Sequence, residues 1–286
     1  MPKAIDMHVH LPTSSWLDVA IQPYRVPAEK FFRATVPTRE MEEVARLYEE
    51  LDILGVLLAW DAETATGLAP LTNDEVASIV RRYPKQFIGF ASVDPWKGKK
   101  AIIEMERAVK ALGLKGAKFH PGIQAFYPHD VHFYPLYEKI SELGVPALFH
   151  TGTSGLGAGM PGGMGIKLDH TRPIWLDHVA ADFPKLTIIG AHPAWPWHEE
   201  MLAIIQHKSN VFMDLSGWSP KYLPKVIVDE ARGRLSDKML FGSDYPFITP
   251  QRWLADFEAV TAAAGFSPET KVKILYDNAA GILRLV

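Results

Sequence analysis

The sequence predicts a single (β/α)8 barrel, and three observations support this fold class. Eight short apolar runs occur along the 286 residues, each followed by a helix-like segment, and no linker, short repeat or charge block divides the chain. Alternating strands and helices imply a parallel sheet, and eight such units favour a closed barrel over an open sheet. Because barrels of roughly 250 residues fold as one unit, residues 1–286 are expected to form one domain.

The eight apolar runs are the expected strands. Buried parallel strands are short and rich in Val, Ile, Leu and Phe because both of their faces are covered. In chain order the runs are residues 4–10, 53–60, 87–94, 116–120, 146–151, 186–192, 210–215 and 239–245.

Capping signals predict the helices between these strands. Thr38, Asn73 and Ser267 carry side-chain oxygens that can accept hydrogen bonds from the first turn of a helix, and Ser267 is followed by Pro and Glu, which favour a helix start. Helices are therefore expected at residues 39–51, 74–83, 99–112 and 133–143, and after Ser267.

Two connections are unusually long. Residues 11–37 follow the first expected strand, and residues 152–165, with seven glycines, follow the fifth. Both follow the carboxyl ends of strands, where barrel enzymes build their sites. The second segment lacks the Gly-Lys-Ser/Thr ending of a phosphate-binding loop, so we expect it to be a mobile lid over the active site.

Composition excludes several classes of function. A net charge of −3 gives no basic surface for nucleic acid or anionic membrane, and no segment approaches the roughly 20 apolar residues of a membrane span. The chain has no cysteine, which excludes disulfides and thiolate metal sites. No signal peptide is recognisable at the start. These features predict a cytoplasmic protein acting on a small molecule, and leave open whether it forms a homo-oligomer.

The first expected strand carries the sequence Asp6-Met-His8-Val-His10. Alternate residues of a strand share a face, so these three polar side chains are expected to point the same way, which in a barrel can be inward. Two imidazoles two residues apart can chelate one cation, although a pattern this short also arises by chance about as often. Asp6 is expected to orient one imidazole or to be a further ligand.

Other expected strands end in residues that bind metals. His120 and its neighbour Lys118 close the fourth strand, and His150, His192 and Asp244 stand at the ends of the fifth, sixth and eighth. Convergence of such residues on the catalytic face predicts a metal site. His120 is expected to turn away from the barrel because Pro121 follows it.

These motifs, together with the closing sequence at residues 278–283, resemble the amidohydrolase superfamily. The resemblance is closest to the amidohydrolase-related branch that contains the aminocarboxymuconate semialdehyde decarboxylase and γ-resorcylate decarboxylase types. It implies a catalytic role for His192, beside one divalent metal, commonly zinc, with Mn²⁺ or Fe²⁺ as alternatives. The implied ligands of that metal are His8, His10, His150 and Asp244.

Three further residues are expected to bind the substrate. Lys118 is expected to contact a carboxylate or carbonyl, because a buried ammonium needs an anionic partner. By the same resemblance, the other reading of Lys118 is a carbamylated lysine that bridges two metals, as in some branches of the superfamily. Trp195 and Phe126 are expected to form part of an aromatic wall for a flat molecule. They belong to a set of aromatic residues after strand ends, whose other members are Trp197, Trp218, Tyr127 and Phe247. Each single member can instead pack between loops.

Three functions compete at this point. The favoured one is hydrolysis of an ester, lactone or amide by a metal-activated water, with Asp244 as the catalytic proton carrier and His192 polarising the carbonyl. The alternative is non-oxidative decarboxylation of an aromatic or unsaturated carboxylic acid. Hydrolysis is favoured because Lys118 can engage a carbonyl and no arginine of the decarboxylase type is matched. A non-catalytic metal-binding protein is the weakest reading.

Overall fold

The computed structural model describes residues 2–285. Eight strands form one sheet in sequential order, and every neighbouring pair is parallel. All eight expected strands are confirmed, each somewhat shorter than the apolar run that predicted it. Their bounds are β1 Ala4–Val9, β2 Ile53–Leu58, β3 Phe87–Ser92, β4 Ala117–Phe119, β5 Ala147–His150, β6 Ile188–Ala191, β7 Val211–Asp214 and β8 Met239–Leu240.

Backbone hydrogen bonds between the first and last strands close the sheet. The amide of Met7 donates to the carbonyl of Phe241 at 2.9 Å, and the amide of His10 donates to Tyr245 at 2.7 Å. The amide of Asp244 donates back to the carbonyl of His8 at 3.0 Å. The sheet is therefore a barrel, which removes free strand edges, and the predicted (β/α)8 fold is confirmed.

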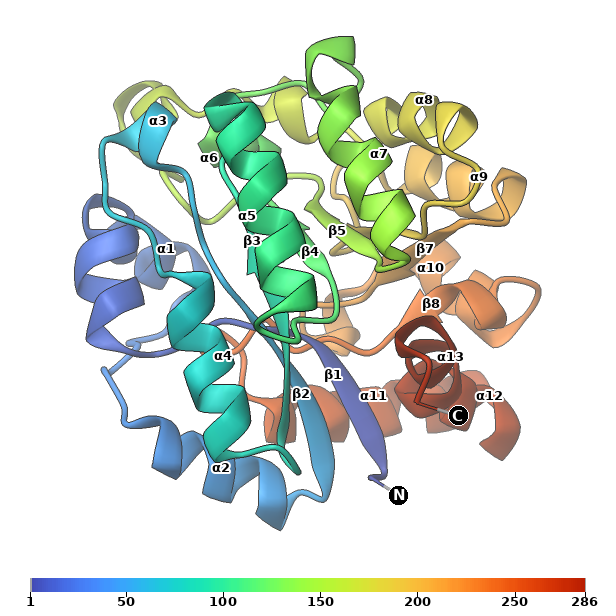
Figure 1. Ribbon diagram of the computed structural model, residues 1–286. Coiled ribbons are helices and arrows are strands. Elements are labelled where there is room, and N and C mark those ends of the chain that lie inside the picture. Colours follow the sequence, from blue (N-terminus) through green and yellow to red (C-terminus); the bar gives the residue numbers. More distant parts are fainter. Residues whose placement is uncertain (1, 286) are drawn as a thin grey trace.

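Helices surround the strands (Figure 1). The longer ones are α1 Gln22–Phe32, α2 Met41–Glu50, α4 Asn73–Arg82, α5 Lys99–Lys110, α7 Tyr134–Leu143, α8 Ile174–Asp182, α9 His198–His207, α10 Lys225–Arg232 and α11 Pro250–Ala264. The short ones are α3 Glu63–Thr66, α6 Pro121–Gln124, α12 Pro268–Val272 and α13 Asn278–Leu283. All expected helices are present.

The predicted caps are only partly confirmed. Ser267 accepts from the amide of Thr270 at 3.2 Å, as expected. Helix α4 is capped by Thr72 instead of Asn73, whose side chain accepts from the amide of Ser92 at 2.9 Å and so ties the helix to β3. Helix α2 has no side-chain cap, and the prediction for Thr38 was wrong. Both predictions failed because the helix begins one or two residues from the expected position. The N-cap of α4 is one residue earlier than Asn73, and the N-cap of α2 is two residues later than Thr38.

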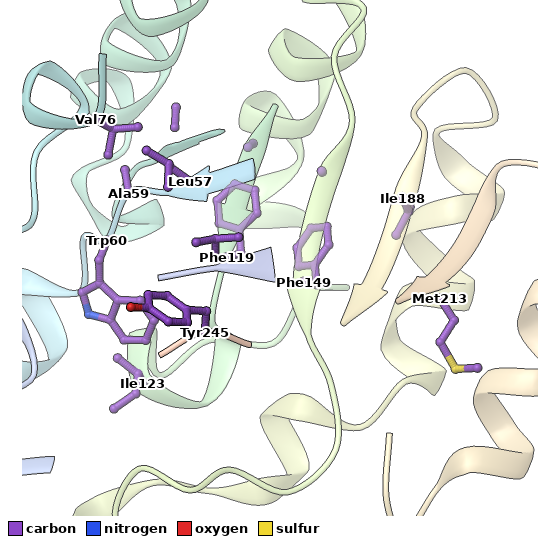
Figure 2. Close-up of a cluster of buried hydrophobic side chains, with 14 of the residues drawn as sticks. Leu57, Ala59, Trp60, Val76, Phe119, Ile123, Phe149, Ile188, Met213 and Tyr245 are labelled. Atoms are coloured by element: carbon purple, nitrogen blue, oxygen red, sulfur yellow. The ribbon is translucent and has the colours of Figure 1, made fainter. Parts of the chain in front are cut away.

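Two clusters of buried side chains fill the molecule. The larger lies between strands and helices, and Figure 2 shows part of it, including Phe119 of β4 and Phe149 of β5. Their rings stack with centroids 5.0 Å apart on adjacent strands. The second cluster joins side chains of β1, β2, β3, β5, β6 and β8 to helix α13. The two clusters hold the strand ends in fixed positions relative to one another.

The register of β1 shifts between Asp6 and Val9. Asp6 pairs with Gly55, and an added Cβ at Gly55 would touch Tyr48 of α2, so this part of the strand faces the helices. The carboxylate of Asp6 accepts from the hydroxyl of Tyr48 at 2.9 Å. The expectation that Asp6 shares a face with His8 was therefore wrong, because the irregular register breaks the alternation.

Both long connections are folded. Residues 11–37 contain a π-helical turn, Ser15–Ala20, followed by α1. Residues 152–165 form tight turns, with Gly157 and Gly159 at φ of 74° and 71°, a conformation that glycine adopts without strain. None of the helices within residues 2–285 combines the length and the apolar character that crossing a bilayer requires.

Gly116 provides a test of the packing inside the barrel. A Cβ at this position would lie about 2.5 Å from the fully buried ring of Phe90. We therefore expect Gly116→Ala to lower the free energy of unfolding by about 1–3 kcal/mol, as overpacked cores do. Chemical denaturation monitored by circular dichroism measures this change.

Gly281 in helix α13 is the matched control, because an added Cβ there meets no atom within 4 Å. Gly281→Ala is expected to leave stability unchanged or to raise it by up to about 1 kcal/mol. Equal effects of the two substitutions would contradict the packing of Phe90 against Gly116.

Candidate active site

Polar side chains converge at the carboxyl ends of the barrel strands. His8 lies near the end of β1 with His10 just beyond it, and His150 closes β5. His192 directly follows β6, and Asp244 lies in the turn after β8. All five side chains are buried. The structure thus brings together the four predicted metal ligands and the predicted catalytic histidine.

The atoms of this group are spaced as ligands of one cation would be. Asp244 Oδ1 lies 3.5 Å from His8 Nε2 and 3.6 Å from His10 Nε2. His192 Nε2 lies 2.9 Å from His150 Nδ1. One ligand atom each from His8, His192 and Asp244 can be chosen so that all three lie within 4.8 Å of one another. This triad includes His192, predicted to be catalytic, in place of His10 and His150, so its geometry supports a cation at this position without fixing the full ligand set. Atoms bound about 2.1 Å from a common metal are separated by about 3.0–3.4 Å, so the residues fit a divalent cation.

The chemistry of the side chains agrees with this fit. Burial lowers the pKa of His8, His10 and His150 well below the usual 6.5, and neighbouring positive groups lower it further. These imidazoles are therefore neutral, which is the form that binds metals. Imidazole and carboxylate ligands suit Zn²⁺, Mn²⁺ and Fe²⁺ alike. The donor set supports a divalent metal without selecting one.

Asp214, at the end of β7, orients this group from below. Its Oδ2 lies 3.0 Å from His8 Nδ1, and its Oδ1 accepts from the backbone amides of His192 at 3.1 Å and Ser216 at 2.9 Å. Sequence reasoning missed Asp214, although it is a carboxylate at a strand end like Asp244. Bonded through Nδ1, His8 presents Nε2 to the site, as metal-binding histidines supported by a carboxylate commonly do.

Lys118 lies at the centre of the site. Its Nζ is 3.1 Å from His8 Nε2, and the side chain is fully buried. Burial lowers the pKa of Lys118, while the charges of Asp214 and Asp244 favour the ammonium form. Burial also raises the pKa of Asp244, and Lys118 opposes that shift. Lys118 therefore lies beside the ligand atoms, and its role toward the substrate stays a prediction.

His192 and Asp244 have left-handed backbone conformations, with φ of 72° and 65°. Such conformations cost non-glycine residues about 1–3 kcal/mol each and often occur at functional sites. Burial lowers the pKa of His192 to about 4, although the charge of Asp214 opposes the shift. The ring of His192 is therefore neutral at neutral pH.

A cavity with about 510 Å³ of empty space, its open mouth included, lies above the group. His120 lines the cavity and stacks on His150 with ring centroids 3.8 Å apart, so the expectation that it turns away was wrong. Its Nδ1 accepts from the amide of Ile123, which holds the ring at the site while Pro121 starts a helix. The aromatic walls are Trp16, Phe31, Phe32, Trp60, Trp218 and Phe247.

The two long connections meet over the cavity. Phe31 and Phe32 of α1 line it together with residues 153–156. A Cβ at Gly155 would come within 2.7 Å of the ring of Phe32, so the segments are in close contact. This placement suits the predicted lid, whose movement stays a prediction.

Two of the predicted substrate-binding residues lie elsewhere. Phe126 is buried in the core against Phe119 and Phe133, because the left-handed turn at Ala125 directs it away from the cavity. Trp195 is 46% exposed and stands outside the cavity wall. The neighbouring Trp218 lines the cavity instead, and its ring centroid lies 6.2 Å from that of Trp195. Phe247, which also follows a strand end, lines the cavity too. Position after a strand therefore identified some of the wall residues but not Trp195 or Phe126.

Comparison with known proteins identifies the family. The family described as "Amidohydrolase" matches residues 5–285. The chain is 26% identical over 249 residues to 2-amino-3-carboxymuconate-6-semialdehyde decarboxylase of Dictyostelium discoideum, which covers 78% of this chain and 68% of that protein. The resemblance inferred from the motifs is confirmed.

Two solved structures have a similar fold. An uncharacterized TIM-barrel protein from Bordetella bronchiseptica is 25% identical, with a TM-score of 0.79 over 98% of both chains. A dihydroxybenzoic acid decarboxylase from Polaromonas sp. JS666, solved with bound manganese and the inhibitor 2-nitroresorcinol, is 19% identical, with a TM-score of 0.69 over 100% of this chain and 98% of that one.

The geometry predicts about one divalent ion per chain, as is usual for a single mononuclear site. His8→Ala and Asp244→Ala are each expected to reduce metal content greatly, because both remove an atom from the converging group. Elemental analysis after reconstitution measures this. His207→Ala is the control, since His207 is an exposed histidine at the end of α9. A wild-type protein that holds no stoichiometric metal after reconstitution would contradict the site.

Proposed function

Because the chain belongs to the amidohydrolase family and is an enzyme of that superfamily, we propose that it is a metal-dependent decarboxylase of a small aromatic or unsaturated carboxylic acid. The activity of its Dictyostelium relative supports decarboxylation. The sequence analysis favoured hydrolysis, but hydrolysis is supported only at the level of the superfamily. Decarboxylation, the alternative there, is therefore preferred here.

The observation that carries the proposal is the cavity itself, with its aromatic walls above the histidine and carboxylate group. Trp16 and Trp60 stand beside His10, and the ring of Trp16 stacks on it with centroids 4.5 Å apart. Phe32 and Phe247 stack on each other at 4.7 Å. Flat aromatic side chains of this kind suit a flat, largely apolar substrate.

The charges around the cavity indicate how many carboxylates the substrate carries. Among the described residues that line it there is no lysine or arginine, and the polar side chains beyond the metal site are His120, Thr153 and Ser154. The one nearby ammonium, that of Lys118, lies within the metal site itself, 3.1 Å from His8 Nε2. A second carboxylate bound there would be buried without a positive partner, which is costly. We therefore propose an acid whose single carboxylate faces the metal site and whose remaining ring is uncharged.

Decarboxylation breaks the bond between the carboxylate carbon and its neighbour. CO₂ leaves, the electron pair stays on the neighbouring carbon, and that carbon takes up a proton. A bound divalent cation would supply positive charge that holds the substrate oxygens and stabilises the negative charge of the transition state. Asp244, whose pKa burial raises, is the proposed carrier of the proton to carbon.

His192 and the cavity walls complete the proposed chemistry. His192 lies beside His150 at the cavity floor and can hydrogen-bond a substrate oxygen. Phe32, on the first long connection, and Trp218, which follows β7, line the cavity. Exclusion of water strengthens each electrostatic contact inside the cavity.

The proposal predicts stoichiometric CO₂ release from a monocarboxylic aromatic acid, such as a hydroxybenzoate, because the cavity presents an apolar wall above one carboxylate site. The assay measures CO₂ and acid release separately across small aromatic acids, esters, lactones and amides, with Asp244→Ala protein as the control. Turnover of an ester, lactone or amide without any CO₂ release would contradict the proposal and favour hydrolysis instead.

His192→Asn is expected to retain the metal and to lose most turnover, by about 10²–10⁴-fold, as loss of a catalytic group outside the metal ligands typically does. Metal content and kcat are measured on the same preparation, and His207→Ala serves again as the control. If metal is lost in proportion to activity, His192 is a ligand and the assigned role is wrong.

A further inference from the structure

A second hollow adjoins the cavity of the candidate active site, and we call it the outer hollow. It holds about 1060 Å³ of empty space, its open mouth included. Phe31, Phe32, Gly217 and Trp218 line both the cavity and the outer hollow. The two spaces therefore share one wall, which is formed by the end of α1 and the connection after β7.

The shared wall contains mobile side chains. The ring of Phe31 is exposed, and those of Phe32 and Trp218 are half-buried. Exposed side chains change rotamer within nanoseconds. Movement of these rings would open a passage from the outer hollow to the cavity without any change in the barrel.

The outer hollow carries positive charge that the cavity wall lacks. Arg33 and Arg252 line it, both are exposed, and none of the described residues that line it is acidic. Arg252 Nε lies 3.9 Å from the carboxylate of Asp256, which Lys221 Nζ also approaches to 3.9 Å. One carboxylate next to two cations leaves this side of the hollow positive.

Positive charge outside the cavity acts on the approach of a ligand. It raises the local concentration of anions and the rate at which they associate, whereas affinity depends more on groups inside the site. The chain has a net charge of −3, so at long range it repels an anion. Two arginines beside the cavity offset this repulsion along one route.

A further hollow borders the cavity at the glycine-rich segment, and it carries no such charge. Thr153, Ser154 and Leu156 line both that hollow and the cavity. Among the described residues that line it, none has a charged side chain. The two routes to the cavity therefore differ in charge, and an anion is attracted to the outer hollow.

We propose that the outer hollow is the entrance to the cavity and that Arg33 and Arg252 steer small carboxylate anions through it. The identity of the ligand as a carboxylate rests on the proposed function. In water, a unit charge about 10 Å from the path of an anion changes its association rate by about 2-fold. The effect fades in concentrated salt, because the screening length falls to a few ångströms.

The test uses the absence of cysteine, which allows one introduced thiol to be modified selectively. Tyr222 is 62% exposed and lines the outer hollow. Zinc-loaded Tyr222→Cys protein is labelled after folding with a positive (trimethylammonioethyl) or a negative (sulfonatoethyl) methanethiosulfonate reagent. Association of benzoate is followed by stopped-flow tryptophan fluorescence, to which Trp218 in the cavity wall contributes.

Benzoate is expected to associate about 4-fold faster with the positively labelled protein than with the negatively labelled one at low salt, because the two labels differ by two charges. The two rates are expected to converge near 0.5 M salt. Neutral benzyl alcohol is expected to show no difference. Without any label, Arg252→Gln and Arg252→Glu are expected to slow benzoate by about 2-fold and about 4-fold.

Met160→Cys, labelled with the same two reagents, is the matched control. Met160 is 43% exposed and lines the hollow at the glycine-rich segment. The two labels there are expected to give nearly equal benzoate rates.

Equal benzoate rates with the two labels at Tyr222 would overturn the proposal. A larger charge effect at Met160 than at Tyr222 would also overturn it, because the entrance would then be the other hollow. If the labels at Tyr222 changed the benzyl alcohol rate as much as the benzoate rate, they would act by obstruction, and steering would be wrong. If no acid releases CO₂, the proposed function fails, while the benzoate rates still decide the entrance.

Discussion

The buried carboxylate of Asp214 is the interaction on which the site depends. A carboxylate removed from water is tolerated only when its oxygens are hydrogen-bonded. Those of Asp214 accept hydrogen bonds from the ring of His8 and from the amides of His192 and Ser216. These bonds join the ends of β7, β1 and β6. They also determine which nitrogen of His8 faces the site. Because Nδ1 bonds Asp214, the lone pair of Nε2 points toward the metal site.

Features that depend on local pattern could be predicted from the sequence. The eight strands and the long helices follow from short apolar runs and from helix signals that neighbouring residues carry. The assembly of the site could also be predicted, because in this fold all strand carboxyl ends meet on one face. The residues brought together in this way are His8, His150, His192 and Asp244. Knowing the order of the strands was sufficient to place these residues together.

Features that depend on distant contacts could not be predicted in the same way. Asp6 leaves the face of His8 because β1 has an irregular register, for which the sequence contains no signal. His120 remains in the cavity because it stacks on His150, a residue 30 positions away in the chain. Phe126 is in the core because Ala125 adopts a left-handed turn. Asp214 was different, since its place at a strand end was visible and was overlooked.

Closure of the barrel has a consequence for how the protein matures. The predicted ligands span the chain from His8 to Asp244, and the backbones of these two residues meet only when the last strand joins the first. A chain still emerging from the ribosome lacks Asp244 until the last strand of the barrel has been made. The metal would then bind after the barrel has closed. Because it would bind the folded chain and not the unfolded one, it would shift the folding equilibrium toward the folded state.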